Sequence, residues 1–306
     1  MNDAEYNPPV GAAIPLEPGL EMIVAPNPSP MTFRGTNTYI LGGTDIAIID
    51  PGPISETHLS AILTATNGRK VRCIVVTHTH LDHSPLARPL AKVTRAPVLA
   101  FGDASSGRSP IMQKLAQEGM AGGGEGIDLR FSPDETVEDG SVVTGSDWSL
   151  RVIHTPGHTG NHIALGWNDA CLTADHVMAW STSLVSPPDG DLTDFMASCK
   201  KLHQNDWRVF YPGHGPQVEN PADRLRWLIA HRRAREAAIV DALGNGPSSA
   251  AAIAEHVYVD TPTALLPAAT RNVFAHLVDL HSRGIVAARA GISPDGEFSL
   301  LRSAQE

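Results

Sequence analysis

The amino-acid sequence predicts a layered α/β fold followed by a smaller, mainly helical domain. Up to about residue 215, short β-rich runs alternate with helix-like stretches, and Gly, Pro or Asp stands at nearly every junction. After residue 220 the helix patterns follow one another instead. The chain has 306 residues, about twice the common domain size. We therefore expect a large domain over residues 1–220 and a second domain over residues 221–306.

The expected strands of the first domain are short runs rich in Val, Ile, Leu and Tyr, residues that fit a pleated sheet. Two stretches with helical patterns, 55–66 and 191–203, separate groups of these runs. This order is typical of sheets covered by helices on the outside. The expected strands are 38–43, 46–52, 71–77, 96–100, 150–155, 162–167, 170–175 and 208–213.

The second domain begins with a long helix pattern that Gly244 closes. Two further helix patterns and a two-stranded hairpin follow, which is the element order of a winged helix. Apolar residues at both ends of the first helix need a protein surface to cover them, so we expect the domain to shape a cleft or form a homo-oligomer interface. The expected helices are 221–244, 248–258 and 263–284, and the hairpin strands are 285–291 and 297–301.

The composition is that of an ordinary globular protein, with 42% hydrophobic and 18% charged residues. We find no apolar run of about 18 residues that could cross a membrane. The first residues contain acids and prolines where an export signal would need bases and an apolar segment, so we expect a cytoplasmic protein. Three widely spaced cysteines favour neither a disulfide framework nor a zinc knuckle.

Charge is distributed unevenly between the two expected domains. Residues 1–220 contain 14 Lys and Arg against 24 Asp and Glu, whereas residues 221–306 contain nine of each. An acidic large domain repels a polyanion at long range. The second domain lacks the excess of Lys and Arg that duplex DNA binding requires. Its dense basic cluster, Arg232, Arg233 and Arg235 beside Glu236, is predicted to be a solvated helix face.

The stretch THTHLDH, residues 77–83, concentrates metal-binding side chains at the end of an expected strand. His78 and His80 are two residues apart, so they can point the same way from an extended segment and share one metal ion. Asp82 and His83 lie beyond the strand, before a helix that we expect Ser84 and Pro85 to start. The turn into this helix can aim them at a second position beside the first. Imidazole and carboxylate are ligands that zinc prefers and that iron or manganese also accepts.

Three further candidate ligands follow expected strands in the same way. His158 lies in HTPGHTG, Asp175 ends ACLTAD, and His214 lies in YPGHG. A single His or Asp at a strand end is more often a turn residue, and the repetition of this context is what indicates a site. His176 is next to Asp175, but neighbours on a strand face opposite ways, which argues against a place in the cleft. Asp50 in IIDPG is interpreted as a buried turn acid rather than a ligand.

The motifs HTHLDH, TPGHT, TAD and PGHG, in this order, resemble those of the metallo-β-lactamase fold superfamily, and GTNTYILGG and IIDPGP are also similar to its first strands and loop. The resemblance implies an αββα four-layer sandwich. It also implies that His78, His80 and His158 hold one metal ion, that Asp82, His83 and His214 hold a second, and that Asp175 bridges the two. The helical tail resembles the C-terminal winged-helix extension of the beta-lactamase-like-2 group, whose animal members are mitochondrial endoribonucleases.

The function that this resemblance implies is metal-dependent hydrolysis. Two divalent ions, zinc first and iron or manganese as alternatives, would hold a hydroxide that attacks an ester-type, amide or phosphodiester bond, and Asp82 would orient it or pass on a proton. The substrate class stays open between a small thioester, lactone or β-lactam and single-stranded RNA. A non-catalytic winged-helix DNA-binding protein is a third possibility, against which the complete ligand set and the neutral tail argue.

Overall fold

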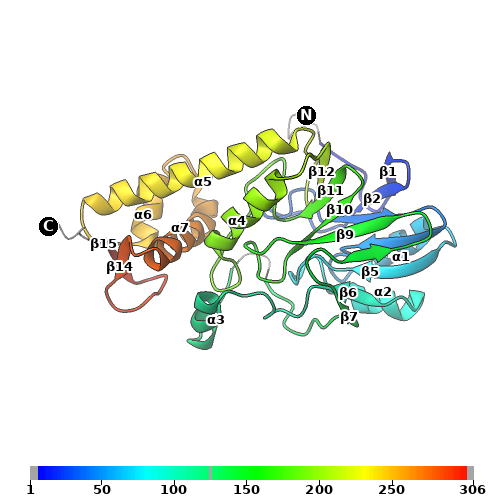
Figure 1. The fold of residues 1–306 in the computed structure, drawn as a ribbon, viewed down its shortest axis with the longest axis horizontal. Coiled ribbons are helices and arrows are strands. Elements are labelled where there is room, and N and C mark those ends of the chain that lie inside the picture. The colour runs from blue at the N-terminus through cyan, green and yellow to red at the C-terminus, as the bar shows by residue number, and fades with distance from the viewer. Residues whose placement is uncertain (1–5, 124–125, 302–306) are drawn as a thin grey trace.

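Two β-sheets stacked face to face form the larger part of the molecule in the computed structural model, which describes residues 6–123 and 126–301 (Figure 1). The first sheet has seven strands in chain order, antiparallel from β1 to β4 and parallel from β4 to β7. Its strands are β1 (Ile14–Glu17), β2 (Leu20–Val24), β3 (Asn37–Leu41), β4 (Asp45–Ile49), β5 (Lys70–Val75), β6 (Val98–Ala100) and β7 (Glu135–Thr136).

The second sheet has five strands in the order β12-β11-β10-β9-β8. Neighbouring strands are antiparallel except β11 and β12, which are parallel because α4 (Leu192–His203) connects them as a crossover. The parallel pair places the ends of β11 and β12 at the same edge of the sheet. The strands are β8 (Val142–Thr144), β9 (Ser149–His154), β10 (Ile163–Trp167), β11 (Ala170–Ala174) and β12 (Val209–Pro212).

Helices cover the outer face of each sheet and complete four layers. On the first sheet, α1 (Glu56–Thr66) and α2 (Ala87–Thr94) pack through residues such as Ile62 and Leu90. On the second sheet, α4 packs through Phe195 and Leu202. A third apolar cluster, which includes Leu41 and Leu165, fills the space between the sheets. This arrangement confirms the αββα sandwich.

The two predicted sandwich helices each begin with a side chain that caps the first turn. Ser55 accepts a hydrogen bond from the backbone N–H of His58 at the start of α1, and Asp191 accepts one from Thr193 at the start of α4. These side chains satisfy donors that the first turn of a helix leaves without a partner.

The C-terminal residues form the predicted winged helix. A separate core gathers Ile253 of α6, Phe274 of α7 and Phe298 of β15, and Met112 and Leu115 of α3 also pack on it. The three strands pair in the order β13-β15-β14. The elements are α3 (Pro110–Gln117), α5 (Pro221–Gly244), β13 (Ser248–Ser249), α6 (Ala250–Val257), η1 (Thr263–Leu265), α7 (Leu266–Ser282), β14 (Val286–Ala288) and β15 (Glu297–Leu300).

The long helix α5 belongs to both packing units (Figure 1). Near its start, Leu225 and Leu228 are buried with α4 against the second sheet. Near its end, Ile239 and Leu243 are buried in the winged-helix core. The expected domain boundary at residue 220 therefore falls at the start of a helix that joins the two units, and it stays a prediction.

Several features differ from the sequence-based expectation. The hairpin of β1 and β2, the short strands β7 and β8, and the helix α3 were not predicted. The helix after the histidine-rich stretch does not start at Ser84 and Pro85 but at Ala87. The Ser84 hydroxyl and N–H both bond to the carbonyl oxygen of His80 and stabilise a turn instead of a cap. Among the described residues, no helix is long and apolar enough to cross a membrane.

The prediction that the basic cluster is a solvated face is wrong for Arg232. Its side chain is 2% exposed, whereas its neighbour Arg233 is exposed. Arg232 lies four residues after the buried Leu228, so both side chains lie on the same face of α5. The basic residue type therefore misled the interpretation at this position.

We expect Leu228→Ala to lower the free energy of unfolding by about 2–5 kcal/mol, because the side chain is fully buried between α5 and the sandwich. Arg226→Ala on the exposed side of the same turn is the matched control, with an expected loss of about 1 kcal/mol or less. Denaturant unfolding measures both values. Equal stability of the two variants would contradict the packing of α5 on the sandwich.

Candidate metal centre

Loops at the ends of four strands bring all seven predicted ligands together at one edge of the sandwich. His78 and His80 follow β5, and the turn after them carries Asp82 and His83. Each of the remaining three follows one of the strands β9, β11 and β12. All seven side chains are buried, and they form two groups in which the ligand atoms lie within 4.8 Å of one another. The three that follow these strands are His158, Asp175 and His214.

The first group consists of His78, His80, His158 and Asp175. The Nδ1 atom of His80 lies 3.0 Å from Nε2 of His78 and 2.9 Å from Nε2 of His158. Asp175 Oδ2 lies 4.0 Å from Nε2 of His78 and 3.6 Å from Nε2 of His158. Three imidazole nitrogens and one carboxylate oxygen therefore face a common point.

The second group consists of Asp82, His83, His214 and again Asp175. The Nε2 atom of His83 lies 3.4 Å from Asp82 Oδ2 and 3.4 Å from Asp175 Oδ1. The Nε2 atom of His214 lies 3.1 Å from Asp82 Oδ2 and 3.2 Å from Asp175 Oδ2. Asp175 is thus the one residue common to both groups.

The donor atoms in both groups have the spacing that metal ions require. Ligands about 2.1 Å from a zinc ion in a tetrahedron lie roughly 3.4 Å from one another, and the distances within each group lie around this value. Two ring nitrogens that face each other closely, such as His78 Nε2 and His80 Nδ1, have room for at most one proton between them. Asp82 Oδ1 is buried without a hydrogen-bond partner among the described residues. A buried acceptor of this kind is costly unless a cation or another donor satisfies it.

The histidines of the first group are neutral at physiological pH. Burial lowers the pKa of His80 to about 3, and His158 nearby acts in the same direction. Burial also lowers the pKa of His78 well below its usual value and lowers that of His158. Their lone pairs are therefore available to a cation without loss of a proton.

The second group has the opposite electrostatic balance. Burial disfavours protonation of His83, but Asp82, Asp175 and Asp50 outweigh it and raise its pKa well above the usual value. Burial likewise opposes protonation of His214, but the carboxylates of Asp175 and Asp82 raise its pKa to about 10. The acids thus create a negative potential that a bound cation can compensate in place of these protons.

Hydrogen bonds on the far side of four rings turn Nε2 towards the centre. The outward Nδ1 atom of His83 lies 2.9 Å from Asp50 Oδ2, and that of His78 lies 3.0 Å from Thr77 Oγ1. The Thr77 hydroxyl in turn donates to Asp50, so it accepts from His78. In the same way, the Nδ1 atom of His158 lies 2.7 Å from the carbonyl oxygen of Leu184, and that of His214 lies 3.2 Å from the carbonyl oxygen of Gly35.

These outer partners include residues that the sequence did not indicate as part of the site. Asp50 is a buried turn acid, as interpreted, and it also orients His83. His162 was missed: it is buried with its ring 5.1 Å from that of His78, and its position four residues after His158 was the available signal. His176 faces away from the cleft, with its Nε2 3.5 Å from Cys199 Sγ.

Two glycines allow the loops to approach the ligands. Gly157, next to His158, has φ +139°, and a Cβ atom there would lie 2.3 Å from the Phe195 Cα. At Gly213, next to His214, a Cβ atom would lie 2.2 Å from Asp175 Oδ1. The sequence motifs TPGH and PGHG thus combine a ligand with the only residue type that fits before it.

Comparison with known proteins agrees with this geometry. The family model described as "Metallo-beta-lactamase superfamily" matches residues 31–214, which include all seven candidate ligands. The chain belongs to the metallo-beta-lactamase superfamily. A second model, "Beta-lactamase associated winged helix domain", matches residues 249–292. As a member of this superfamily the protein is a hydrolase.

Similar proteins extend over most of the chain. A Caenorhabditis elegans protein named "Beta-lactamase-like protein 2 homolog" is 30% identical over 89% of this chain and 87% of its own length. An Aspergillus fumigatus protein named "Atrochrysone carboxyl ACP thioesterase" is 29% identical over 75% of this chain and 66% of its own length. A solved beta-lactamase domain protein from Burkholderia ambifaria, 21% identical, covers 98% of this chain and 96% of its own with a TM-score of 0.78, so the whole fold is shared.

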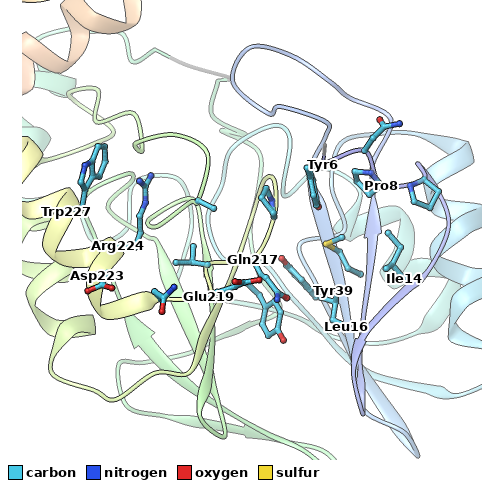
Figure 2. Close-up of a pocket in the computed structure, with 18 residues that line it drawn as sticks. Tyr6, Pro8, Ile14, Leu16, Tyr39, Gln217, Glu219, Asp223, Arg224 and Trp227 are labelled. Atoms are coloured by element: carbon cyan, nitrogen blue, oxygen red, sulfur yellow. The ribbon is translucent and has the colours of Figure 1, made fainter. Parts of the chain in front are cut away.

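Residues 178–180, which follow Asp175, line two separate hollows of this superfamily member. A cavity of about 50 Å³ reaches His80, His158 and Asp175 and is bounded by Met178 and Trp180. Ala179, between these two residues, instead lines a groove of about 780 Å³. Figure 2 shows residues of the first sheet, such as Tyr39, facing residues at the start of α5 across this groove. The groove is mostly apolar and has the size of a small-molecule site.

We expect Gly157→Ala to lower the free energy of unfolding by more than about 3 kcal/mol, because φ +139° is strained for alanine and its Cβ meets the Phe195 backbone. Gly140→Ala is the control, since Gly140 also has positive φ but nothing within 4 Å of its added Cβ. That variant should lose about 1–2 kcal/mol. Similar losses in denaturant unfolding would show that the close approach beside His158 does not matter.

Proposed function

We propose that the protein hydrolyses ester-type bonds, thioesters first, with two metal ions held by the seven converging ligands. The observation that carries the proposal is the position of Asp175, whose carboxylate faces both ligand groups. A side chain shared in this way supports a pair of ions rather than two independent sites. Zinc is the first candidate because all seven ligands are imidazoles or carboxylates.

Each ligand has a role in this proposal that its surroundings support. His78, His80 and His158 would hold the first ion through nitrogens that are neutral before it binds. Asp82, His83 and His214 would hold the second ion, where the carboxylate charge compensates a cation. Asp175 would bridge both ions. Bound there, divalent ions supply a water that ionises near neutral pH and a Lewis acid for the carbonyl oxygen.

Asp82 is the proposed catalytic residue. Its Oδ2 faces His83, His214 and the Thr36 hydroxyl, at 3.4, 3.1 and 3.4 Å. Its Oδ1 is buried and has no hydrogen-bond partner among the described residues. This oxygen would accept a hydrogen bond from the attacking water, orient it and take up its proton. Burial alone would raise the pKa of Asp82, but His83 and His214 outweigh it and hold the pKa below its usual range, so the carboxylate is ionised.

Three observations favour a small thioester over RNA. The groove lined by Ala179, across residues 178–180 from the cavity at the site, is mostly apolar, which suits the non-reacting part of an organic acyl group. The net charge of −10 is unfavourable for a polyanion. Relatives over most of this chain include a protein named as an acyl carrier protein thioesterase. The name of the similar Caenorhabditis elegans protein, "Beta-lactamase-like protein 2 homolog", states no substrate.

A substrate panel tests this proposal. We expect the zinc-loaded protein to hydrolyse an aromatic acyl thioester at least tenfold faster, relative to the uncatalysed rate, than a β-lactam, a lactone or a short single-stranded RNA. Asp82→Ala should reduce the thioester rate by about 10²–10⁴-fold, because it removes the proposed proton acceptor. Glu118→Ala, an exposed acid paired with Lys114, is the control and should retain the parent rate.

The outcomes separate the substrate from the mechanism. Preferred cleavage of RNA would make the protein a nuclease and overturn the thioester assignment while leaving the site intact. Thioester hydrolysis that is unchanged in Asp82→Ala would mean that the active site lies elsewhere.

A further inference from the structure

The winged-helix unit contacts the segment that carries the outer partners of His158. This segment, residues 183–185, is hydrogen-bonded to α5 and to α7. Ser183 and Leu184 both reach His158: the ring Nδ1 lies 2.7 Å from the Leu184 carbonyl oxygen and 3.0 Å from the Ser183 hydroxyl oxygen. The position of this segment therefore fixes the orientation of the His158 ring and the direction of its Nε2.

Two side chains from different helices hold the segment in place. Arg232 of α5 donates from Nη2 to the carbonyl oxygen of Ser183 and from Nη1 to Asn272 Oδ1, at 3.0 Å for the second bond. Asn272 of α7 accepts a further hydrogen bond from the Val185 N–H at 3.3 Å. The guanidinium and the amide thus bind backbone groups on both sides of Leu184.

The burial of this arrangement indicates that it is specific. Arg232 is 2% exposed, and its guanidinium also lies 5.2 Å from the centre of the Phe195 ring. A charged side chain is rarely buried so completely unless its hydrogen bonds compensate the loss of hydration. Arginine presents a planar fork of donors that can bind two acceptors at fixed angles, which lysine cannot do.

We propose that Arg232 and Asn272 are positioning residues that hold His158 ready to bind the first metal ion, so that the winged helix stabilises the hydrolase centre. The inference rests on the proposed function, because it requires His158 to be a ligand. The path runs from Arg232 and Asn272 through Ser183 and Leu184 to the His158 ring. Loss of a group that orients a ligand typically weakens metal binding by about 10–100-fold.

Zinc titration in competition with a chromophoric chelator tests the proposal on the full chain. Arg232→Met and Asn272→Ala should weaken one of the two zinc sites by about 10–100-fold and leave the other within about twofold of the parent. Arg232→Lys should retain only part of the affinity. Asn272→Asp keeps an oxygen acceptor for both hydrogen bonds and should retain the full zinc affinity of the parent. Arg233→Met, an exposed arginine on the same helix, is the matched control and should match the parent.

Circular dichroism and thermal melting show whether each variant is folded. Folded Arg232→Met and Asn272→Ala proteins that bind both ions as tightly as the parent would overturn the positioning role. Equal weakening of both sites would also overturn it, because it indicates general loosening. If Arg232→Met does not fold, equal zinc affinity of Asn272→Ala and Asn272→Asp would overturn it. A parent that binds fewer than two ions would overturn the proposed function, and the positioning role with it.

Discussion

The Asp175 carboxylate faces both groups of buried ligands, and much of the surrounding structure serves to place it there. It follows β11, which is parallel to β12, so Asp175 and His214 arrive at the same edge of the second sheet. His78 and His80 follow β5 of the first sheet and reach the same edge from the other layer. Gly213 leaves room for the carboxylate, because a Cβ atom at that position would overlap it. The stacking of the two sheets thus brings a dense set of buried imidazole and carboxylate groups together at one edge.

The two ligand groups differ in the direction in which their surroundings shift the histidine pKa values. The histidines of the first group are neutral because burial lowers their pKa values, whereas Asp82, Asp175 and Asp50 outweigh burial in the second group and raise the pKa of His83. The outer hydrogen bonds of the rings, to Asp50, Thr77 and main-chain oxygens, fix which nitrogen faces inward. One of these bonds connects the centre to the winged helix through residues 183–185. Arg232 of α5 and Asn272 of α7 therefore bear on the geometry of a single histidine.

The convergence of the seven candidate ligands could be predicted because each is a chemically distinctive residue that follows a recognisable strand, and six of them lie after a Pro-Gly turn or in a dense histidine motif. The order of the elements predicted sheets covered by helices and the winged helix, and the resemblance to the superfamily implied the four-layer sandwich. The sequence could not indicate the partners that act through main-chain atoms, such as Leu184, since any residue type supplies a carbonyl. The sequence wrongly indicated that Arg232 is exposed, because it lies among other basic residues and only tertiary packing buries it. It also misplaced the start of α2, because Ser84 can cap a helix or bond to a turn carbonyl with equal ease.

Anomalous diffraction from crystals of the zinc-loaded protein tests whether two ions share Asp175. Two zinc peaks about 3.5–4 Å apart are expected. One should be bound by His78, His80 and His158, the other by Asp82, His83 and His214, with Asp175 contacting both. A single zinc ion at full occupancy after zinc loading, or two ions of which Asp175 contacts only one, would show that Asp175 does not join two metal sites.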